Sequence, residues 1–188
     1  MIREITKKLK SIALLEAIIS PEWEYRYYSY NSNWGEDEEM ASMRDGSGDE
    51  WFLWVKNDLA ALKVMSQEFD TLNDIEAIKN QFPTDYVSFI SEPAFSINES
   101  TSLWYLSETE WVKFDVNEEE TKELIKVFEF TASEYKEWAE DYYENEFPLE
   151  AIEKIMAGNC SDSEVHLLNE DLSYKDIEDE INEIGYNR

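Results

Sequence analysis

The chain has 188 residues, of which 44 are Asp or Glu and only 16 are Lys or Arg, so its formal net charge at pH 7 is −28. A body this negative repels nucleic acid and anionic membrane surfaces, and it attracts cationic surfaces. The composition therefore argues against a nucleic-acid-binding or membrane-binding protein, and it makes a basic protein the expected partner.

The rest of the composition indicates a folded chain in spite of the charge. Hydrophobic residues make up 43% of the sequence and aromatic residues 14%, with seven Trp and eleven Tyr. Each buried aromatic ring removes roughly 150–250 Å² from water, so a sizeable core can form. At this length we expect a single domain over 1–188, with a helix at 1–20, mainly β structure at 22–116 and helices at 117–188.

The first segment, 2–19, has apolar residues along one helical stripe and ends before Pro21. Its basic start and short apolar run imitate a secretory signal. However, Glu16 interrupts the run and no small-residue cleavage site follows, so we predict an amphipathic helix. No run approaches the ~20 apolar residues of a membrane span. Cys160 is the only cysteine, which excludes an intrachain disulfide and fits a cytoplasmic protein.

The next segment has the alternating and apolar runs of an antiparallel meander. We predict strands at 23–30, 39–44, 51–55 and 59–65. The run 51–55 is apolar on both faces, which predicts a central strand. Residues 31–35 read as a turn, and 45–49 as a hairpin loop whose two glycines can take a positive φ at little cost.

Beyond residue 65 the pattern turns from β to helical. Asn73 and Glu76 have capping-box spacing for a short helix, 85–90 reads as a helix or turn, and a second hairpin is expected around 107–110, between strands at 102–106 and 111–114. Helices are predicted at 118–129, 131–146, 148–157, 161–169 and 173–183, and capping boxes of Thr131 with Glu134 and of Ser161 with Glu164 precede two of them. The fold class is therefore α+β: an N-terminal helix, an antiparallel sheet of four to six strands and a helical C-terminal half.

Four phrases of the sequence resemble a family of uncharacterised bacterial proteins. They are YYSYNSNW at 27–34, MASMRDGSGDEWF at 40–52, EPAF at 92–95 and EIGY at 183–186, in that order over nearly the whole chain. The resemblance implies a bacterial, single-domain protein and no particular activity. In size and acidity the chain also resembles the immunity proteins of toxin systems, a likeness of composition alone.

The predicted helix at 131–146 separates aromatic from acidic residues at 100° per residue. One side carries Tyr135, Trp138, Ala139 and Tyr142, and another carries Glu134, Glu137, Asp141 and Glu144. Acidic residues at i+3 and i+4 repel each other by roughly 0.2–0.5 kcal/mol per pair. The acidic side is either a solvated face that keeps the protein soluble or a docking face for a cationic partner. Our leading hypothesis is a non-enzymatic protein that binds a basic protein, such as an immunity or antitoxin-like inhibitor.

The alternative hypothesis is a ligand-binding or enzymatic domain with a pocket between the sheet and the helical half. Arg26 and Arg44 lie on predicted strands of an arginine-poor chain, and with Tyr28 and Trp51 they would line such a pocket. Arg26 lies among aromatic residues, where it could stack, form a structural ion pair or bind an anionic group. The sequence leaves these roles open.

Catalytic and metal motifs are lacking. The oxygens of Asp45–Glu50 would suit a hard cation, but the loop is short and the EF-hand pattern is absent. With His166 and Cys160 as the only residues of their types, zinc sites built from those ligands are excluded. We expect no cofactor, no metal site and no catalytic residue, although carboxylate-pair hydrolysis stays open.

Overall fold

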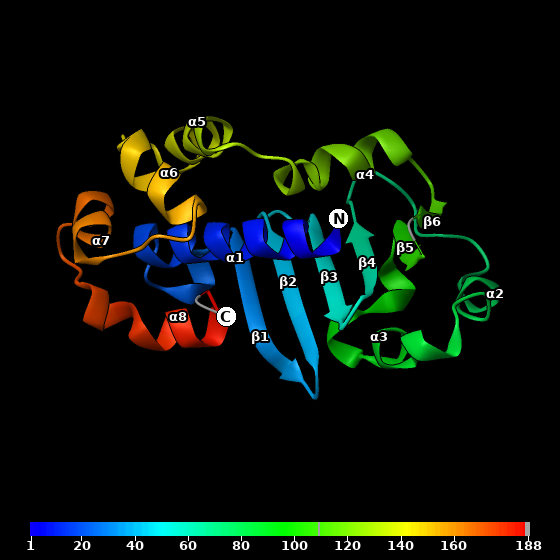
Figure 1. Ribbon diagram of the computed structural model, residues 1–188. Helices are drawn as coiled ribbons and strands as arrows, with labels where there is room; N and C mark the ends of the chain where they lie inside the picture. The colour runs from blue at the N-terminus through cyan, green and yellow to red at the C-terminus, as the bar shows by residue number, and fades with distance from the viewer. Residues whose placement is uncertain (109, 187–188) are drawn as a thin grey trace. The chain divides into compact units, whose positions relative to one another are not determined.

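The computed structural model describes residues 1–108 and 110–186 (Figure 1). The chain divides into two compact units: unit 1 consists of Met1–Ser32 and Lys126–Arg188, and unit 2 of Asn33–Ile125. The architecture is α+β, with an N-terminal helix, a six-stranded antiparallel sheet and helices in the C-terminal half, as the sequence predicts. The single domain stays a prediction.

Unit 1 is mainly helical. Its elements are α1 (Ile2–Ile19), η1 (Trp23–Tyr25), the first part of β1 (Tyr28–Gly35), η5 (Lys126–Phe128), α5 (Ala132–Tyr143), α6 (Leu149–Met156), α7 (Asp162–Leu168), η6 (Tyr174–Ile177) and α8 (Glu178–Ile184). Helix α1 contacts α6, α7 and α8, which gather around its C-terminal half (Figure 1). Its apolar stripe is buried there, because Ile12, Leu15 and Ile18 are fully inaccessible.

Unit 2 is built on the sheet, whose strands follow one another in chain order as a meander. After β1 come β2 (Glu38–Arg44), β3 (Glu50–Lys56), β4 (Leu59–Met65), β5 (Ser102–Ser107) and β6 (Glu110–Asp115), followed by α4 (Glu118–Leu124). The register places Met40 opposite Trp54, and Trp54 opposite Ala61. All of β3 except its end residues is buried, so the predicted central position of this strand is confirmed.

The long connection between β4 and β5 completes the core of unit 2. It contains α2 (Ile75–Lys79), η2 (Thr84–Tyr86), α3 (Val87–Ser91), η3 (Pro93–Phe95) and η4 (Ile97–Glu99). Its rings of Phe82, Tyr86 and Phe89 pack against Trp54 and other apolar residues of the sheet. One apolar face of the sheet is thereby covered by aromatic side chains, which is the use that the aromatic-rich composition predicts.

The first predicted strand is wrong at both ends. Residues 23–25 form a 3₁₀ helix, and the strand runs from Tyr28 through 31–35, where the sequence predicts a turn. The polar residues Asn31 and Ser32 lie in this strand, which pairs with β2, and their side chains donate hydrogen bonds of 3.2 and 2.9 Å to Glu183. The chain reverses instead after Gly35, where Asp37 takes a φ of 59°.

Other boundaries differ by a few residues. Helix α2 begins after Asp74 without a side-chain cap, so the predicted capping box of Asn73 with Glu76 is wrong. The segment 173–183 is divided into η6 and α8, and 118–129 into α4 and η5. The second hairpin is present as β5 and β6, while Thr109 of its predicted turn lies outside the described residues.

Candidate functional site

Helix α5 begins at a capping box, as its sequence predicts. Thr131 Oγ1 accepts a hydrogen bond from the backbone N–H of Glu134, and the Glu134 carboxylate accepts from the N–H of Thr131 at 2.8 Å. The side chains of Tyr135 and Ala139 are buried. The predicted acidic set is exposed and consists of Glu134, Glu137, Asp141 and Glu144. The helix α5 therefore has a buried side and an acidic, solvent-facing side, but it ends at Tyr143 and not at the predicted residue 146, so Glu144 directly follows its last turn.

The four exposed carboxylates differ in their partners. Hydrogen bonds from Thr131 lower the pKa of Glu134, so this group stabilises the start of the helix. In the described part of the chain, Glu137, Asp141 and Glu144 have no hydrogen-bond or ion-pair partner for their side chains. The Lys of α5, Lys136, pairs with Glu140 at 2.6 Å. Three carboxylates of the acidic side thus remain without a neutralising cation.

A group of aromatic rings borders this acidic side. Trp138 and Tyr142 stack with their ring centroids 5.3 Å apart and an interplanar angle of 13°, and Tyr27 packs its edge against both at 4.9 Å. Tyr142 is 42% exposed, while Trp138 and Tyr27 are half-buried. We call Tyr27, Trp138 and Tyr142 the aromatic surface. Because Asp141 follows Trp138 by three positions on the helix, carboxylate and rings are neighbours.

A fully buried carboxyl group lies beneath the aromatic surface. Glu16 Oε1 accepts a hydrogen bond of 2.7 Å from the Tyr135 hydroxyl. Its Oε2 accepts from the Tyr143 hydroxyl at 2.7 Å and from the backbone N–H groups of Tyr27 and Tyr28 at 3.0 and 3.3 Å. Burial raises the pKa of Glu16, although these hydrogen bonds oppose the rise. Glu16 thus joins α1 and α5 to the chain around Tyr27.

Sequence reasoning missed this role of Glu16. The signal was a single carboxylate inside the apolar run 12–19, on a helix whose neighbouring positions are buried. A charge at such a position has to find hydrogen-bond donors, because burying it alone costs several kcal/mol. The donors come from residues 11 to 127 positions further along the chain, so their identity could not be derived from local spacing.

Arg26 is a structural residue. Its guanidinium donates to both carboxylate oxygens of Glu180, at 2.7 and 2.9 Å, and to the carbonyl oxygens of Ser20 and Pro21, at 2.8 and 2.6 Å. These bonds join the segment after α1 to α8 within unit 1. Tyr28, two residues after Arg26, is buried, and its ring packs against the rings of Tyr27 and Trp138. Of the roles left open for Arg26, the geometry supports the ion pair.

Arg44 and Trp51 belong to unit 2, on opposite faces of the sheet. Arg44 ends β2, is exposed and lies 5.4 Å from the ring of Phe52. Trp51 pairs with Met43, so its side chain shares the face of Met43 and not that of Arg44. It is fully buried and donates a hydrogen bond of 2.9 Å to the Leu124 carbonyl. Arg44 and Trp51 therefore do not line one cavity, and the pocket between sheet and helical half stays a prediction.

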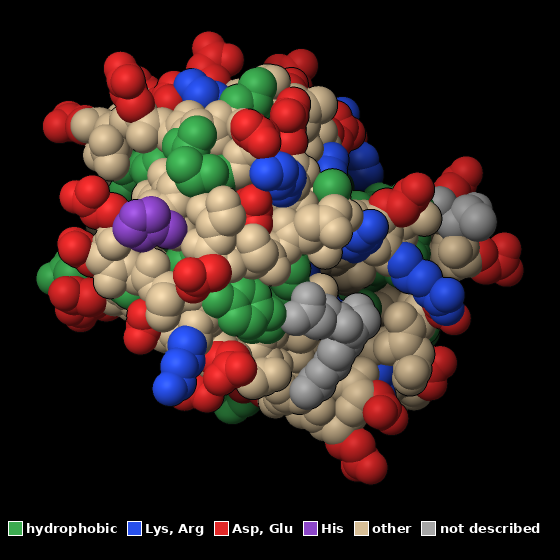
Figure 2. Space-filling model, turned by 60° about the vertical axis from the view of Figure 1, so that its left-hand side comes forward, with side chains coloured by type: hydrophobic (Ala, Val, Ile, Leu, Met, Phe, Trp, Pro, Cys, Tyr) green, Lys and Arg blue, Asp and Glu red, His purple; other side chains and the backbone are tan. Residues whose placement is uncertain are grey.

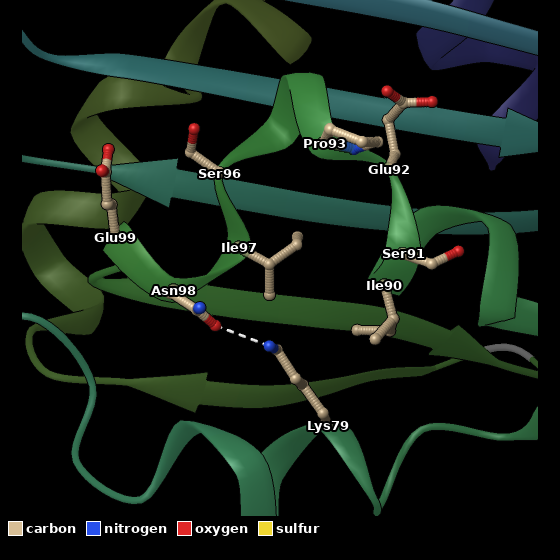
Figure 3. A pocket seen from close by; sticks show the side chains of 9 residues that line it. All are labelled: Lys79, Ile90, Ser91, Glu92, Pro93, Ser96, Ile97, Asn98 and Glu99. Carbon is tan, nitrogen blue, oxygen red and sulfur yellow. Dashed lines mark hydrogen bonds between the residues drawn. The ribbon is translucent and has the colours of Figure 1, made fainter.

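Unit 2 contains a surface cavity of about 350 Å³ between α2 and the residues that follow α3 (Figure 3). Lys79 reaches in from α2, and its ammonium group donates to Asn98 at 2.5 Å and to Glu76 at 2.8 Å. Ile90 and Ile97 supply apolar surface, while the acidic residues of the lining carry opposite charge to Lys79. The lining is thus a mixture of apolar and polar side chains, of which Lys79 and Asn98 are joined by a hydrogen bond.

The remaining candidates for chemistry have structural explanations. Asp45 Oδ1 accepts hydrogen bonds of 2.8–2.9 Å from the N–H groups of Ser47, Gly48 and Asp49, so this loop is closed by its own carboxylate. Among the residues that the structure describes, no three His, Cys, Asp or Glu side chains are placed to hold a metal ion. Burial raises the pKa of Cys160 to about 11, which makes it a poor nucleophile. His166 is exposed on α7 (Figure 2).

Comparison with known proteins adds no relative: the chain matches no protein-family model, no curated protein and no solved structure. In the part of the chain that is described, no helix combines the length and apolar character needed to cross a bilayer. The candidate site is therefore defined by its own residues alone. It consists of the acidic side of α5, the aromatic surface beside it and the buried Glu16 below.

Proposed function

We propose that this protein is a non-enzymatic, cytoplasmic binding protein that engages a basic protein through α5, in the manner of an immunity or antitoxin-like inhibitor. One observation carries the proposal. Glu137, Asp141 and Glu144 are exposed without a cationic partner among the described residues, and they border an aromatic surface. Acidic groups and aromatic rings together match the two needs of a basic partner, charge neutralisation and apolar contact.

Physical chemistry supports each half of this arrangement. The net charge of −28 attracts a basic protein from a distance and raises the rate of encounter, an effect that salt screens. Like charges on one helix repel each other by roughly 0.2–0.5 kcal/mol per pair, and a cationic partner relieves that repulsion. Tyr and Trp contribute a large share of binding energy at protein interfaces, so the aromatic surface supplies affinity that charge alone lacks.

The competing interpretation is an acidic surface without a specific partner. Figure 2 shows Asp and Glu side chains scattered over the visible face rather than gathered in one patch, so charge alone does not single out α5. What singles it out is the aromatic surface beside unneutralised carboxylates. A variant that removes charge from α5 must therefore be compared with one that removes the same charge elsewhere.

The cavity at Lys79 and Asn98 favours a second candidate function, the binding of a small polar molecule. A thermal-shift screen with metabolites and metal ions tests it, because a ligand at 100 times its dissociation constant stabilises a protein by about 2.7 kcal/mol. A compound that shifts the melting temperature of wild type but not of Lys79→Met would support this candidate. A screen without any shift would count against it.

The proposed function is tested by capture from an extract of the source cell. The bait proteins are wild type, the α5 variant Glu137→Gln/Asp141→Asn/Glu144→Gln, and the control variant Glu153→Gln/Glu170→Gln/Asp171→Asn, which removes three exposed carboxylates from other parts of unit 1. We expect wild type and the control variant to recover the same basic protein at low salt and less of it at moderate salt. The α5 variant should recover little at either.

Two results would contradict the proposal. Equal recovery by the α5 and control variants would show that binding follows overall charge and not α5. If wild type recovers no basic protein at either salt concentration, the proposed function itself is wrong. Identification by mass spectrometry gives the isoelectric point of each recovered protein and so decides whether it is basic.

A further inference from the structure

We infer that the aromatic surface binds an arginine side chain of the basic partner, an inference that rests on the proposed function. A guanidinium group is planar, weakly hydrated and able to stack on an aromatic ring, whereas the ammonium group of lysine is a compact, strongly hydrated charge. Tyr142 is 42% exposed and stacks on Trp138, with an angle of only 13° between the two ring planes. A stacked pair of rings of this kind fits a planar cation.

The carboxylates around the rings fit the same group. On the surface of α5, Trp138 lies one turn from both Glu134 and Asp141, at i−4 and i+3. Arginine combines a face that stacks with an edge that donates hydrogen bonds to carboxylates. Rings and acceptors are thus present side by side. The chain itself contains a contact between an arginine and an aromatic ring, because the guanidinium group of the exposed Arg44 lies 5.4 Å from the ring of Phe52.

The aromatic surface is also held in place before any partner arrives. Glu16 accepts hydrogen bonds from the backbone N–H of Tyr27 and from the hydroxyl of Tyr143, which directly follows Tyr142 on α5. Tyr27 in turn packs against both Trp138 and Tyr142. Rings fixed in this way lose little conformational entropy on binding, which favours affinity.

The negative charge of α5 disfavours other possible occupants of the aromatic surface. A second copy of this chain would bring another net charge of −28 to the same place, and nucleic acid would bring phosphates. Both would meet the unneutralised carboxylates of α5 with charge of the same sign. A segment rich in arginine is the occupant that satisfies both the rings and the carboxylates.

The experiment compares two labelled peptides of equal charge, nine arginines and nine lysines, by fluorescence polarisation at one low salt concentration. The proteins are wild type, Tyr142→Leu, Tyr142→Phe and, as a control for loss of an exposed ring, Tyr25→Leu, since Tyr25 is 63% exposed in the same unit. We expect wild type to bind the arginine peptide about threefold to fivefold more tightly than the lysine peptide. Tyr142→Leu should lose this preference without changing the dissociation constant of the lysine peptide, while the other two variants keep it.

Each contrary result has a distinct meaning. Equal, salt-sensitive affinity of wild type for both peptides would overturn the inference and leave the proposed function standing. A preference that survives in Tyr142→Leu, or in Tyr142→Gln if the Leu variant melts below wild type, would also overturn it. A dimer seen by sedimentation and lost in Tyr142→Leu would assign the surface to a second copy instead. Failure of wild type to bind either peptide would overturn the proposed function together with the inference.

Discussion

The hydroxyl of Tyr135 on α5 donates a hydrogen bond of 2.7 Å to Oε1 of Glu16 on α1, and both side chains are fully buried. The two residues are 119 positions apart in the sequence. The bond therefore ties the helix that carries the acidic side to the N-terminal helix of the same unit. The stability and the position of the proposed docking face depend on a polar contact that solvent does not reach.

Replacing Glu16 by Gln tests the energetics of this buried group. Burial raises the pKa of Glu16 in the folded protein above its ordinary value. A carboxyl group of this kind contributes its full stability below the pKa of the unfolded state, and that contribution is lost as the pH rises through the pKa of the folded state. We therefore expect the free energy of unfolding of wild type, relative to Glu16→Gln, to fall as the pH rises from about 4 toward neutrality.

Denaturant unfolding of both proteins over this pH range measures the difference. The control is Glu16→Ala, which leaves the donors of Tyr135, Tyr143, Tyr27 and Tyr28 without their acceptor. It should cost about 3 kcal/mol or more throughout the range. A wild-type advantage over Glu16→Gln that grows with pH would show that hydrogen bonding outweighs burial at this site.

The two tyrosine donors should be energetically coupled. Tyr135→Phe and Tyr143→Phe each remove one hydroxyl that donates a hydrogen bond to Glu16. Each should lower the free energy of unfolding by about 1–3 kcal/mol. Because both hydroxyls donate to one carboxyl group, the effect of the double variant should differ from the sum of the single effects by at least about 0.5 kcal/mol. This is the lower end of the range for neighbouring groups in one network. Tyr25→Phe, at an exposed ring, serves as the control and should change stability little. Additive effects would mean that the two hydroxyls are not coupled to each other through Glu16.

Arg26 should be sensitive to a substitution that keeps its charge. Lysine cannot donate at once to both oxygens of Glu180 and to the carbonyls of Ser20 and Pro21, so Arg26→Lys should lower the free energy of unfolding by about 1–3 kcal/mol. The matched control is Arg44→Lys, at an exposed position of β2, where a change within about 0.5 kcal/mol is expected. Equal changes in the free energy of unfolding for Arg26→Lys and Arg44→Lys would contradict a structural role for Arg26.

Short-range sequence patterns predict several of the helices and strands correctly. The apolar stripe of α1, the doubly apolar run of β3 and the capping boxes at Thr131 and Ser161 are short-range signals, and each marks an element of the structure. The prediction fails at residues 23–35. Aromatic alternation indicated a strand where Trp23 and Tyr25 are in fact exposed, and the polar run 31–35 indicated a turn where the chain continues as a strand that pairs with β2.

The candidate site could be predicted only in part for the same reason. Helical periodicity is local, so the sequence separates the acidic and aromatic sides of α5 correctly. The contact of Tyr27 with Trp138 and Tyr142, and the burial of Glu16 beneath them, join three distant segments. The structural ion pair of Arg26 with Glu180 likewise spans 154 positions. No spacing rule connects residues so far apart, and only the fold reveals that they are neighbours.

The central claim is that α5 receives a basic protein, and the association rate of the captured partner tests it most directly. Stopped-flow or surface-binding kinetics over a series of salt concentrations would compare wild type with the α5 variant Glu137→Gln/Asp141→Asn/Glu144→Gln and the control variant Glu153→Gln/Glu170→Gln/Asp171→Asn. We predict that the α5 variant keeps its stability, associates more slowly and depends less on salt, while the control variant behaves more like wild type. An α5 variant that associates as fast as the control variant, with the same salt dependence, would contradict the claim.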